Sequence, residues 1–226
     1  MMETKDKSRI RGFIFDMDGT LFDTEKLYRA FWYVVAEQRG FHVDDEMLSR
    51  MRGMALPKGA LIFETRNPEF SYYEERRRRM ELVYEEVDRN GVPEKPGLRK
   101  LLAFLRAQGY RTAVASSSPE AQVQRYMERN GLTEQFDVLL GGDAVENGKP
   151  APDLFLLAAE KLGLPPAECV VVEDSENGIR AGAAAGGFVI GIPDLDPLDP
   201  VRDLLDFECS RLDEIIPWIS DAEKRC

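Results

Sequence analysis

The sequence has little histidine and little cysteine. Its 226 residues include one histidine, His42, and three cysteines, Cys169, Cys209 and Cys226. A single histidine excludes catalytic triads and metal sites that are built from several histidines. The cysteines are widely spaced and form neither a CxxC metal motif nor a disulfide framework, so we expect a reducing, cytoplasmic environment. Other side chains, carboxylates above all, must carry any chemistry.

The sequence also lacks an excess of positive charge and any long apolar run. Its 30 lysine and arginine residues stand against 41 aspartate and glutamate residues, a formal net charge of -11. Nucleic-acid binding depends on basic residues that neutralise phosphates, so we expect no nucleic-acid partner. No apolar run approaches the roughly 20 residues that span a bilayer, and residues 1–12 lack the apolar core of a signal peptide. We expect no membrane partner and, by default, a monomer.

Strand and helix patterns alternate through most of the chain. Leucines at i, i+3, i+4 and i+7 predict a helix from residue 98. Short, continuously apolar strands are predicted at 13–17, 111–116, 136–141, 169–173 and 188–192, with further helices at 119–130, 152–162 and 177–185. This alternation is typical of an α/β fold, a Rossmann-like doubly wound parallel sheet covered by helices on both faces.

One segment interrupts the alternation after the first strand. Residues 25–91 show only helical patterns, with helices expected at about 24–40, 44–52 and 68–89 and a loop at 53–59. We therefore predict an α/β catalytic core formed by residues 1–24 and 92–226, and an inserted helical cap domain formed by residues 25–91.

Polar side chains follow the predicted strands. In a doubly wound parallel sheet, ligands bind outside the carboxyl ends of the strands, so these residues are expected to lie close together. Carboxylates, hydroxyls and one lysine suit a hard divalent cation such as Mg²⁺ and a phosphate group. The residues at the strand ends are Asp16, Asp18, Thr20, Ser116, Ser117, Ser118, Asp143, Lys149, Glu173 and Asp174.

Four of these stretches form an ordered set of motifs. "DMDGTLFDT", "VASSSP", "NGKPAPDLF" and "VVEDSENG" resemble the four motifs of the haloacid dehalogenase superfamily, specifically its branch of β-phosphoglucomutases and small-molecule phosphatases. The resemblance covers nearly the whole chain and implies a helical cap inserted into a Rossmann-like core. A DxDGT stretch alone is moderately specific, whereas four ordered motifs at successive strand ends are strong.

The resemblance also implies roles for individual residues. Asp16 would be the nucleophile that forms an aspartyl-phosphate. Asp18 would protonate the leaving oxygen and then deprotonate the attacking water, with Thr20 holding it in place. Ser116, Ser117 and Lys149 would bind phosphate. The Mg²⁺ ligands would be the Asp16 carboxylate, the Asp18 backbone carbonyl, Asp174 and Glu173, the last either directly or through water.

The fate of the phosphoryl group separates two candidate functions. Tyr28 stands where the sugar phosphomutases of this branch carry a histidine, and Leu56 stands where they carry a phosphate-binding arginine. We therefore predict a Mg²⁺-dependent hydrolase of a small phosphorylated metabolite such as a sugar phosphate. A phosphomutase remains the alternative because Arg52 and Lys58 lie close by, and these two residues with Tyr28 are the expected specificity residues. More distant alternatives are a receiver-like phosphoaspartate module and a non-catalytic protein on this fold.

Two charged stretches are interpreted as solvated. In "EERRRRMELVYEE", Glu74 precedes Arg78 and Glu75 precedes Arg79 by four residues, which predicts an exposed, ion-paired helix face. Asp194 and its acidic neighbours lie between prolines and lack the central glycine of an EF-hand loop, so we expect an exposed loop there.

Overall fold

The structure is a computed structural model that describes residues 5–51 and 56–223. The chain divides into two compact units. One consists of Met1–Asp23 and Val92–Cys226, and the other, here called the helical unit, of Thr24–Gly91. Arg52, an expected specificity residue, lies outside the described residues.

The first unit is built on a parallel sheet in the order β3-β2-β1-β4-β5-β6. Its central strands β1 and β4 are apolar up to Glu173, the last residue of β4, because helices cover both faces, and every residue of these two strands is buried. The two-residue strand β6 was not predicted, since it is too short to show a pattern. The strands are β1 Gly12–Phe15, β2 Arg111–Ala115, β3 Val138–Leu140, β4 Cys169–Glu173, β5 Phe188–Gly191 and β6 Phe207–Glu208.

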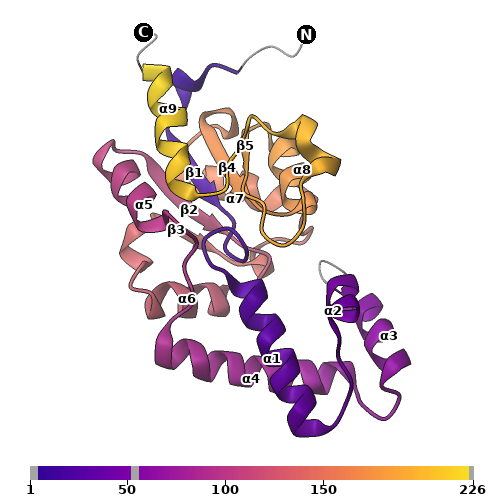
Figure 1. Ribbon diagram of the computed structural model, residues 1–226. Coiled ribbons are helices and arrows are strands. Elements are labelled where there is room, and N and C mark those ends of the chain that lie inside the picture. Colours follow the sequence, from indigo (N-terminus) through magenta and orange to yellow (C-terminus); the bar gives the residue numbers. More distant parts are fainter. Residues whose placement is uncertain (1–4, 52–55, 224–226) are drawn as a thin grey trace. The chain divides into compact units, whose positions relative to one another are not determined.

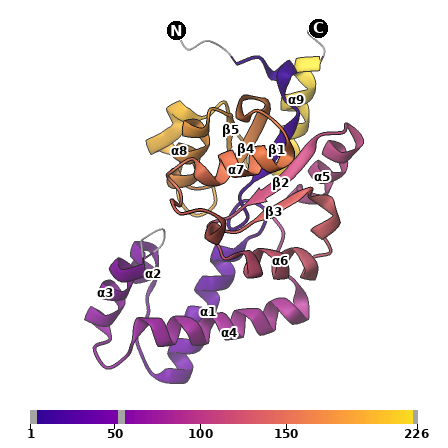
Figure 2. The ribbon, with the colours of Figure 1, turned by 180° about the vertical axis from the view of Figure 1, so that it is seen from behind.

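Helices cover the two faces of this sheet. Figures 1 and 2 show α7 and α8 on one side and α5 and α9 on the other, and the first pair packs on Ile14 and Val171 of the central strands. The expected α/β sandwich is confirmed. The helices are α5 Leu98–Ala107, α6 Glu120–Arg129, α7 Asp153–Leu162, α8 Glu176–Ala185 and α9 Ile215–Glu223, with short 3₁₀ turns at Lys7–Arg9, Thr133–Gln135, Gly142–Ala144, Pro166–Glu168, Asp199–Leu204 and Leu212–Glu214.

In its described residues, 24–51 and 56–91, the helical unit has four helices and a core of its own. They are α1 Thr24–Arg39, α2 Asp45–Met51, α3 Leu56–Arg66 and α4 Tyr72–Asn90. Trp32 packs among the rings of Phe41, Phe63 and Tyr72, at centroid separations between 5.6 and 6.4 Å. The unit therefore buries its own apolar surface.

The prediction of a loop at 53–59 was wrong for its second half, because α3 begins at Leu56. Pro57 occupies the first turn, where proline is tolerated since its missing N–H has no partner in the helix. Helix α4 also begins later than expected. The Asn67 side chain instead accepts a hydrogen bond from the His42 N–H at 2.9 Å and donates one to the His42 carbonyl at 3.0 Å, which holds this part of the chain in a turn.

Two charged residues of α4 are buried, against the prediction of an exposed face. Only 1% of Glu75 and 8% of Arg79 is exposed, because both lie on the side of α4 that faces the core of the helical unit. The expected exposed loop is also wrong at Asp194. Its side chain is buried and forms an ion pair of 2.6 Å with the equally buried Lys95.

A membrane-spanning helix is not found in the described part of the chain, where no helix combines sufficient length with sufficient apolar character.

Candidate active site

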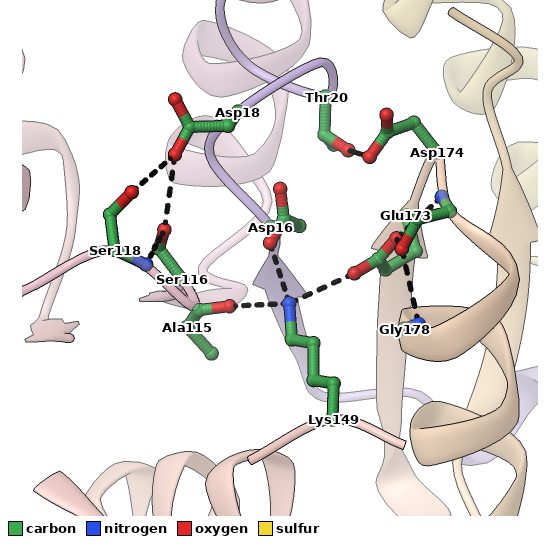
Figure 3. A network of polar contacts seen from close by, with 11 residues as sticks. Asp16, Asp18, Thr20, Ala115, Ser116, Ser118, Lys149, Glu173, Asp174 and Gly178 are labelled. Atoms are coloured by element: carbon green, nitrogen blue, oxygen red, sulfur yellow. Dashed lines mark hydrogen bonds and ion pairs between the residues drawn. The ribbon is translucent and has the colours of Figure 1, made fainter. Parts of the chain in front are cut away.

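The candidate site lies where the strand order reverses. Strand β1 pairs with β2 on one side and with β4 on the other, and a crevice at such a reversal is the usual place for a ligand in open α/β sheets. Asp16 follows the last residue of β1, and Glu173 ends β4. Their side chains therefore reach the same edge of the sheet, as Figure 3 shows.

Lys149 joins the ends of these strands. Its Nζ donates to Asp16 Oδ1 at 2.5 Å, to Glu173 Oε1 at 2.9 Å and to the carbonyl oxygen of Ala115, the last residue of β2, at 3.0 Å (Figure 3). All three hydrogens of the ammonium are thus engaged. The lysine side chain is 4% exposed, so the bridge is shielded from water.

Burial and charge act against each other in this cluster. Burial opposes the charged form of Lys149, but the carboxylates of Asp16 and Glu173 outweigh it and raise the pKa of the ammonium. Burial raises the pKa of Asp16 to about 8, although Lys149 opposes the shift and Glu173 reinforces it. Burial, followed by the charge of Glu173, also raises the pKa of Asp174 well above its usual range. One ammonium does not balance the buried carboxylates of Asp16 and Glu173 together with the half-buried carboxylate of Asp174.

The carboxylate cluster has the composition of a hard-cation site. Oxygen atoms of Asp16, Glu173 and Asp174 all lie within 4.8 Å of one another. Magnesium prefers oxygen ligands and is usually held by one or two carboxylates together with water and substrate phosphates. A divalent cation would supply the positive charge that the cluster lacks, so the residues fit Mg²⁺.

The Asp18 carboxylate lies apart from this cluster. Its Oδ2 accepts hydrogen bonds from the hydroxyls of Ser118 at 2.7 Å and Ser116 at 3.4 Å (Figure 3). The sequence predicts that Thr20 holds Asp18, but the structure places the Thr20 hydroxyl on another carboxylate. The Thr20 hydroxyl donates to Asp174 Oδ1 at 3.2 Å.

The serines after β2 differ in their placement. Ser116 is buried, accepts a hydrogen bond from the backbone N–H of Ser118 at 3.0 Å and donates to Asp18, so its hydroxyl faces the candidate site. Ser117, an expected phosphate-binding residue, is exposed. Ser118 takes the place beside Asp18 instead. The sequence placed Ser118 at the strand end without assigning it a role, because three consecutive serines give no signal about which ones face inward.

Glu173 is fixed on both of its oxygens. Oε1 accepts from Lys149, and Oε2 accepts from the backbone N–H of Ser175 at 2.7 Å and from its hydroxyl at 2.9 Å. Ser175 is also the N-cap of α8, where its hydroxyl accepts from the N–H of Gly178 at 3.1 Å. The same short segment therefore begins a helix and orients a carboxylate.

Two glycines leave room for the acids. Gly19 has φ +85°, a left-handed conformation that favours glycine, and a Cβ there would lie 2.2 Å from Asp174 Oδ2. A Cβ at Gly178 would lie 1.6 Å from Glu173 Oε1. The carboxylates of Glu173 and Asp174 thus occupy the space that a side chain at Gly178 or Gly19 would fill.

The remaining predicted residues belong to the helical unit. Tyr28 on α1 is half-buried, with its ring beside the Arg79 guanidinium. Lys58 on α3 is exposed. The structure therefore describes Tyr28 and Lys58 within that unit, but not Arg52.

Comparisons with known proteins show the family of this chain. The model of the haloacid dehalogenase-like hydrolase family matches residues 10–186. A phosphorylated carbohydrates phosphatase from Thermotoga maritima is 35% identical over 181 residues, which cover 76% of this chain and 80% of that protein. The β-phosphoglucomutase of Bacillus subtilis is 30% identical over 196 residues, which cover 84% of this chain and 86% of that protein.

A solved structure shows the same fold. The crystal structure of a HAD family hydrolase from Deinococcus radiodurans, with bound phosphate and sodium, has a TM-score of 0.79 and 27% identity. The match covers 95% of this chain and 97% of that one. The chain therefore belongs to the haloacid dehalogenase-like hydrolases, as its four motifs predicted.

Proposed function

We propose that the protein hydrolyses the phosphate monoester of a small phosphorylated carbohydrate, with Mg²⁺, through an aspartyl-phosphate on Asp16. The observation that supports this most is the Lys149 bridge between Asp16 and Glu173 at the strand reversal. The bridge places the Asp16 carboxylate, the proposed nucleophile, beside the buried ammonium group of Lys149. The carboxylates of the same site fit a metal ion. The phosphatase from Thermotoga maritima supports the class of substrate.

In the first step, a carboxylate oxygen of Asp16 attacks phosphorus and the bond between phosphorus and the ester oxygen breaks. Asp18 gives its proton to the departing oxygen, which leaves as an alcohol. The hydroxyls of Ser116 and Ser118 orient Asp18, since both donate to its Oδ2. Lys149 lies beside Asp16 and would offset the charge that develops on the phosphoryl oxygens.

In the second step, a water molecule attacks the phosphorus of the aspartyl-phosphate. Asp18 accepts a proton from this water, inorganic phosphate leaves and the Asp16 carboxylate is restored. Asp16, Glu173 and Asp174 would hold Mg²⁺ together with the Asp18 backbone carbonyl. The cation would offset the negative charge of the phosphoryl group as it is transferred.

A sugar phosphomutase is the second candidate, favoured by the 30% identity to the β-phosphoglucomutase of Bacillus subtilis. Hydrolysis is preferred because Tyr28 lacks the imidazole that the mutases of this branch carry. In either reaction, Tyr28, Arg52 and Lys58 are the proposed specificity residues of the helical unit.

Phosphate release from a panel of phosphate monoesters tests the proposal. We expect release in Mg²⁺, loss of release in EDTA, and no release from Asp16→Asn. Asp199→Asn is the control, because Asp199 is exposed and pairs only with Arg202 among the described residues. Conversion of β-glucose 1-phosphate to glucose 6-phosphate with little free phosphate would favour the mutase instead. Inactivity in both assays would contradict both candidates.

A further inference from the structure

Helix α6 carries a buried glutamine whose side chain reaches toward the candidate active site. Only 8% of Gln122 is exposed. Its Nε2 donates a hydrogen bond to the Ser118 hydroxyl at 3.1 Å, and this hydroxyl donates to Asp18 Oδ2 at 2.7 Å. All three residues belong to the unit formed by Met1–Asp23 and Val92–Cys226. A continuous chain of hydrogen bonds within one unit therefore links α6 to the proposed acid–base residue.

The chemistry of the amide fixes the direction of these hydrogen bonds. The nitrogen of a glutamine side chain only donates, so the Ser118 oxygen accepts from Gln122. A hydroxyl has one hydrogen, and Asp18 Oδ2 is the acceptor that the described residues place within its reach. The Ser118 hydrogen is therefore directed at Asp18.

The backbone orients Ser116 in the same sense. Its hydroxyl oxygen accepts from the N–H of Ser118 at 3.0 Å, and its hydroxyl donates to Asp18 Oδ2 at 3.4 Å, a longer and weaker contact. Two hydroxyl hydrogens thus converge on one oxygen of Asp18. Figure 3 shows the other oxygen, Oδ1, pointing away from both serines. Because the serine hydrogens occupy Oδ2, a proton that Asp18 carries is placed on Oδ1.

The loop that carries the serines is braced against the loop after β3. The N–H of Gly142 donates to the Ser118 carbonyl at 2.8 Å, and Asp143 Oδ1 accepts from the N–H of Glu120, the first residue of α6, at 2.9 Å. These two hydrogen bonds hold the serine loop and the start of α6 together. The distance between Gln122 and Ser118 is therefore set by the fold.

We propose that Gln122 is a positioning residue for the general acid. Through Ser118 it keeps Asp18 Oδ2 a hydrogen-bond acceptor, so that Oδ1 is the oxygen that gives its proton to the departing alcohol. Gln122 does not touch the reacting atoms in this arrangement. The inference rests on the proposed phosphatase function and adds to it a residue from α6 that lies outside the four motifs.

Two kinds of leaving group distinguish this role from a structural one. An alkoxide needs a proton as it leaves, whereas 4-nitrophenolate is a weak base and leaves without one. The constant kcat/KM reports the steps up to that departure. For the sugar phosphate that the wild type hydrolyses fastest, we expect Gln122→Met to lower kcat/KM about 5- to 10-fold and Gln122→Glu more than about 10-fold. For 4-nitrophenyl phosphate we expect a change below about 2-fold.

Gln124→Met and Gln124→Glu are the matched controls. Gln124 also lies on α6 and is half-buried, but its side chain has no hydrogen-bond partner within residues 5–51 and 56–223. We expect both controls to hydrolyse both esters as the wild type does. If Gln122→Met lowers kcat/KM equally for the two esters, its role is structural and the proposal is overturned. No loss for either ester would overturn it as well.

A stability measurement tests the direction of the hydrogen bonds without catalysis. Gln122→Glu replaces the donor by an acceptor and leaves the Ser118 oxygen between two carboxylates. Asp18→Asn supplies an amide donor at the other end, so the hydrogen bonds can run in reverse, from position 18 through Ser118 to position 122. We expect Gln122→Glu to lower the midpoint of urea unfolding by about 0.5 M in the wild type and by much less in Asp18→Asn.

Ser118→Ala is the control for direct repulsion between the two carboxylates. Without the hydroxyl, Asp18→Asn should no longer reduce the cost of Gln122→Glu. A reduction that persists in Ser118→Ala would show repulsion through space, and a reduction that is absent with Ser118 present would show that Gln122 does not donate. Either result overturns the inference. If the chain hydrolyses no ester, the proposed function fails, and the unfolding measurements still decide whether Gln122 orients Asp18.

Discussion

Gly178→Ala distinguishes helix propensity from the packing of Glu173. Alanine in a helix is favoured over glycine by about 0.8–1 kcal/mol, so propensity alone predicts that the substitution stabilises α8. The structure predicts the opposite. The new Cβ would lie 1.6 Å from Glu173 Oε1 and 1.9 Å from its Cδ, where ordinary contacts begin at 3.4 Å.

The magnitude follows from what the Glu173 carboxylate would lose by moving away. A retreat of roughly 1.8 Å would break its hydrogen bonds with Lys149 at 2.9 Å and with the N–H and hydroxyl of Ser175 at 2.7 and 2.9 Å. A hydrogen bond to a charged group contributes about 1.5–3 kcal/mol, and partial relaxation makes the losses less than additive. We therefore expect Gly178→Ala to lower the free energy of unfolding by about 2–4 kcal/mol and to weaken Mg²⁺ binding.

Urea unfolding with and without Mg²⁺, together with a Mg²⁺ titration, measures both effects. Gly148→Ala is the control, because a Cβ at Gly148 would meet nothing within 4 Å. In a Glu173→Ala background the clash is removed, so Gly178→Ala should become neutral or stabilising. If Gly178→Ala is as stable as the wild type and binds Mg²⁺ equally well, the packing argument is wrong.

Three further predictions follow from the same unit. Lys95→Met leaves the buried Asp194 carboxylate unpaired and should cost about 3–5 kcal/mol in urea unfolding, part of which Asp194→Asn should restore; an unchanged midpoint would contradict this. The pKa of Asp16 is raised from 3.8 to about 8 in the folded state, so between these pH values the folded protein binds a proton that the unfolded chain does not. Without metal, the free energy of unfolding should therefore fall as the pH rises through this range, by at most about 1.4 kcal/mol per pH unit. In EDTA, Asp16→Asn should therefore gain stability relative to the wild type between pH 5 and pH 8. If the difference in the free energy of unfolding between the two proteins stays constant over this range, the raised pKa of Asp16 is refuted. Ser118→Ala removes the 2.7 Å hydrogen bond to the proposed acid–base residue and should lower kcat about 10-fold, whereas the exposed Ser117→Ala should not; equal effects would contradict the assignment.

Much of the site could be predicted because strand ends of a parallel sheet meet at one edge. Asp16, Lys149 and Glu173 are far apart in sequence, but each follows or ends a predicted strand or lies in the loop after one. The apolar runs were sufficient to locate β1 and β4, since strands buried on both faces need no polar alternation. The topology then brings the carboxylates and the lysine together.

Residues whose placement depends on one turn of backbone could not be predicted. Ser117 and Ser118 differ only in which way the chain turns after β2, and the turn places Ser118 beside Asp18. Arg79 escaped prediction for a related reason. Acidic and basic residues four apart suggest an exposed face on any helix, and the burial of Arg79 depends on Tyr28 and Trp32, which belong to another helix.

The two carboxylates that follow one another at the end of β4 depend on two glycines for space. Glu173 and Asp174 are adjacent at the end of β4, yet each contacts a glycine from a different segment, Gly178 at the start of α8 and Gly19 in the turn after β1. A side chain at either glycine would displace one of two neighbouring carboxylates. These carboxylates and Asp16 lie close enough to repel one another, so a displacement of either would disturb the hydrogen bonds from Lys149, Ser175 and Thr20 that hold them. The room that the two glycines leave is therefore as much a part of the candidate metal site as the oxygens themselves.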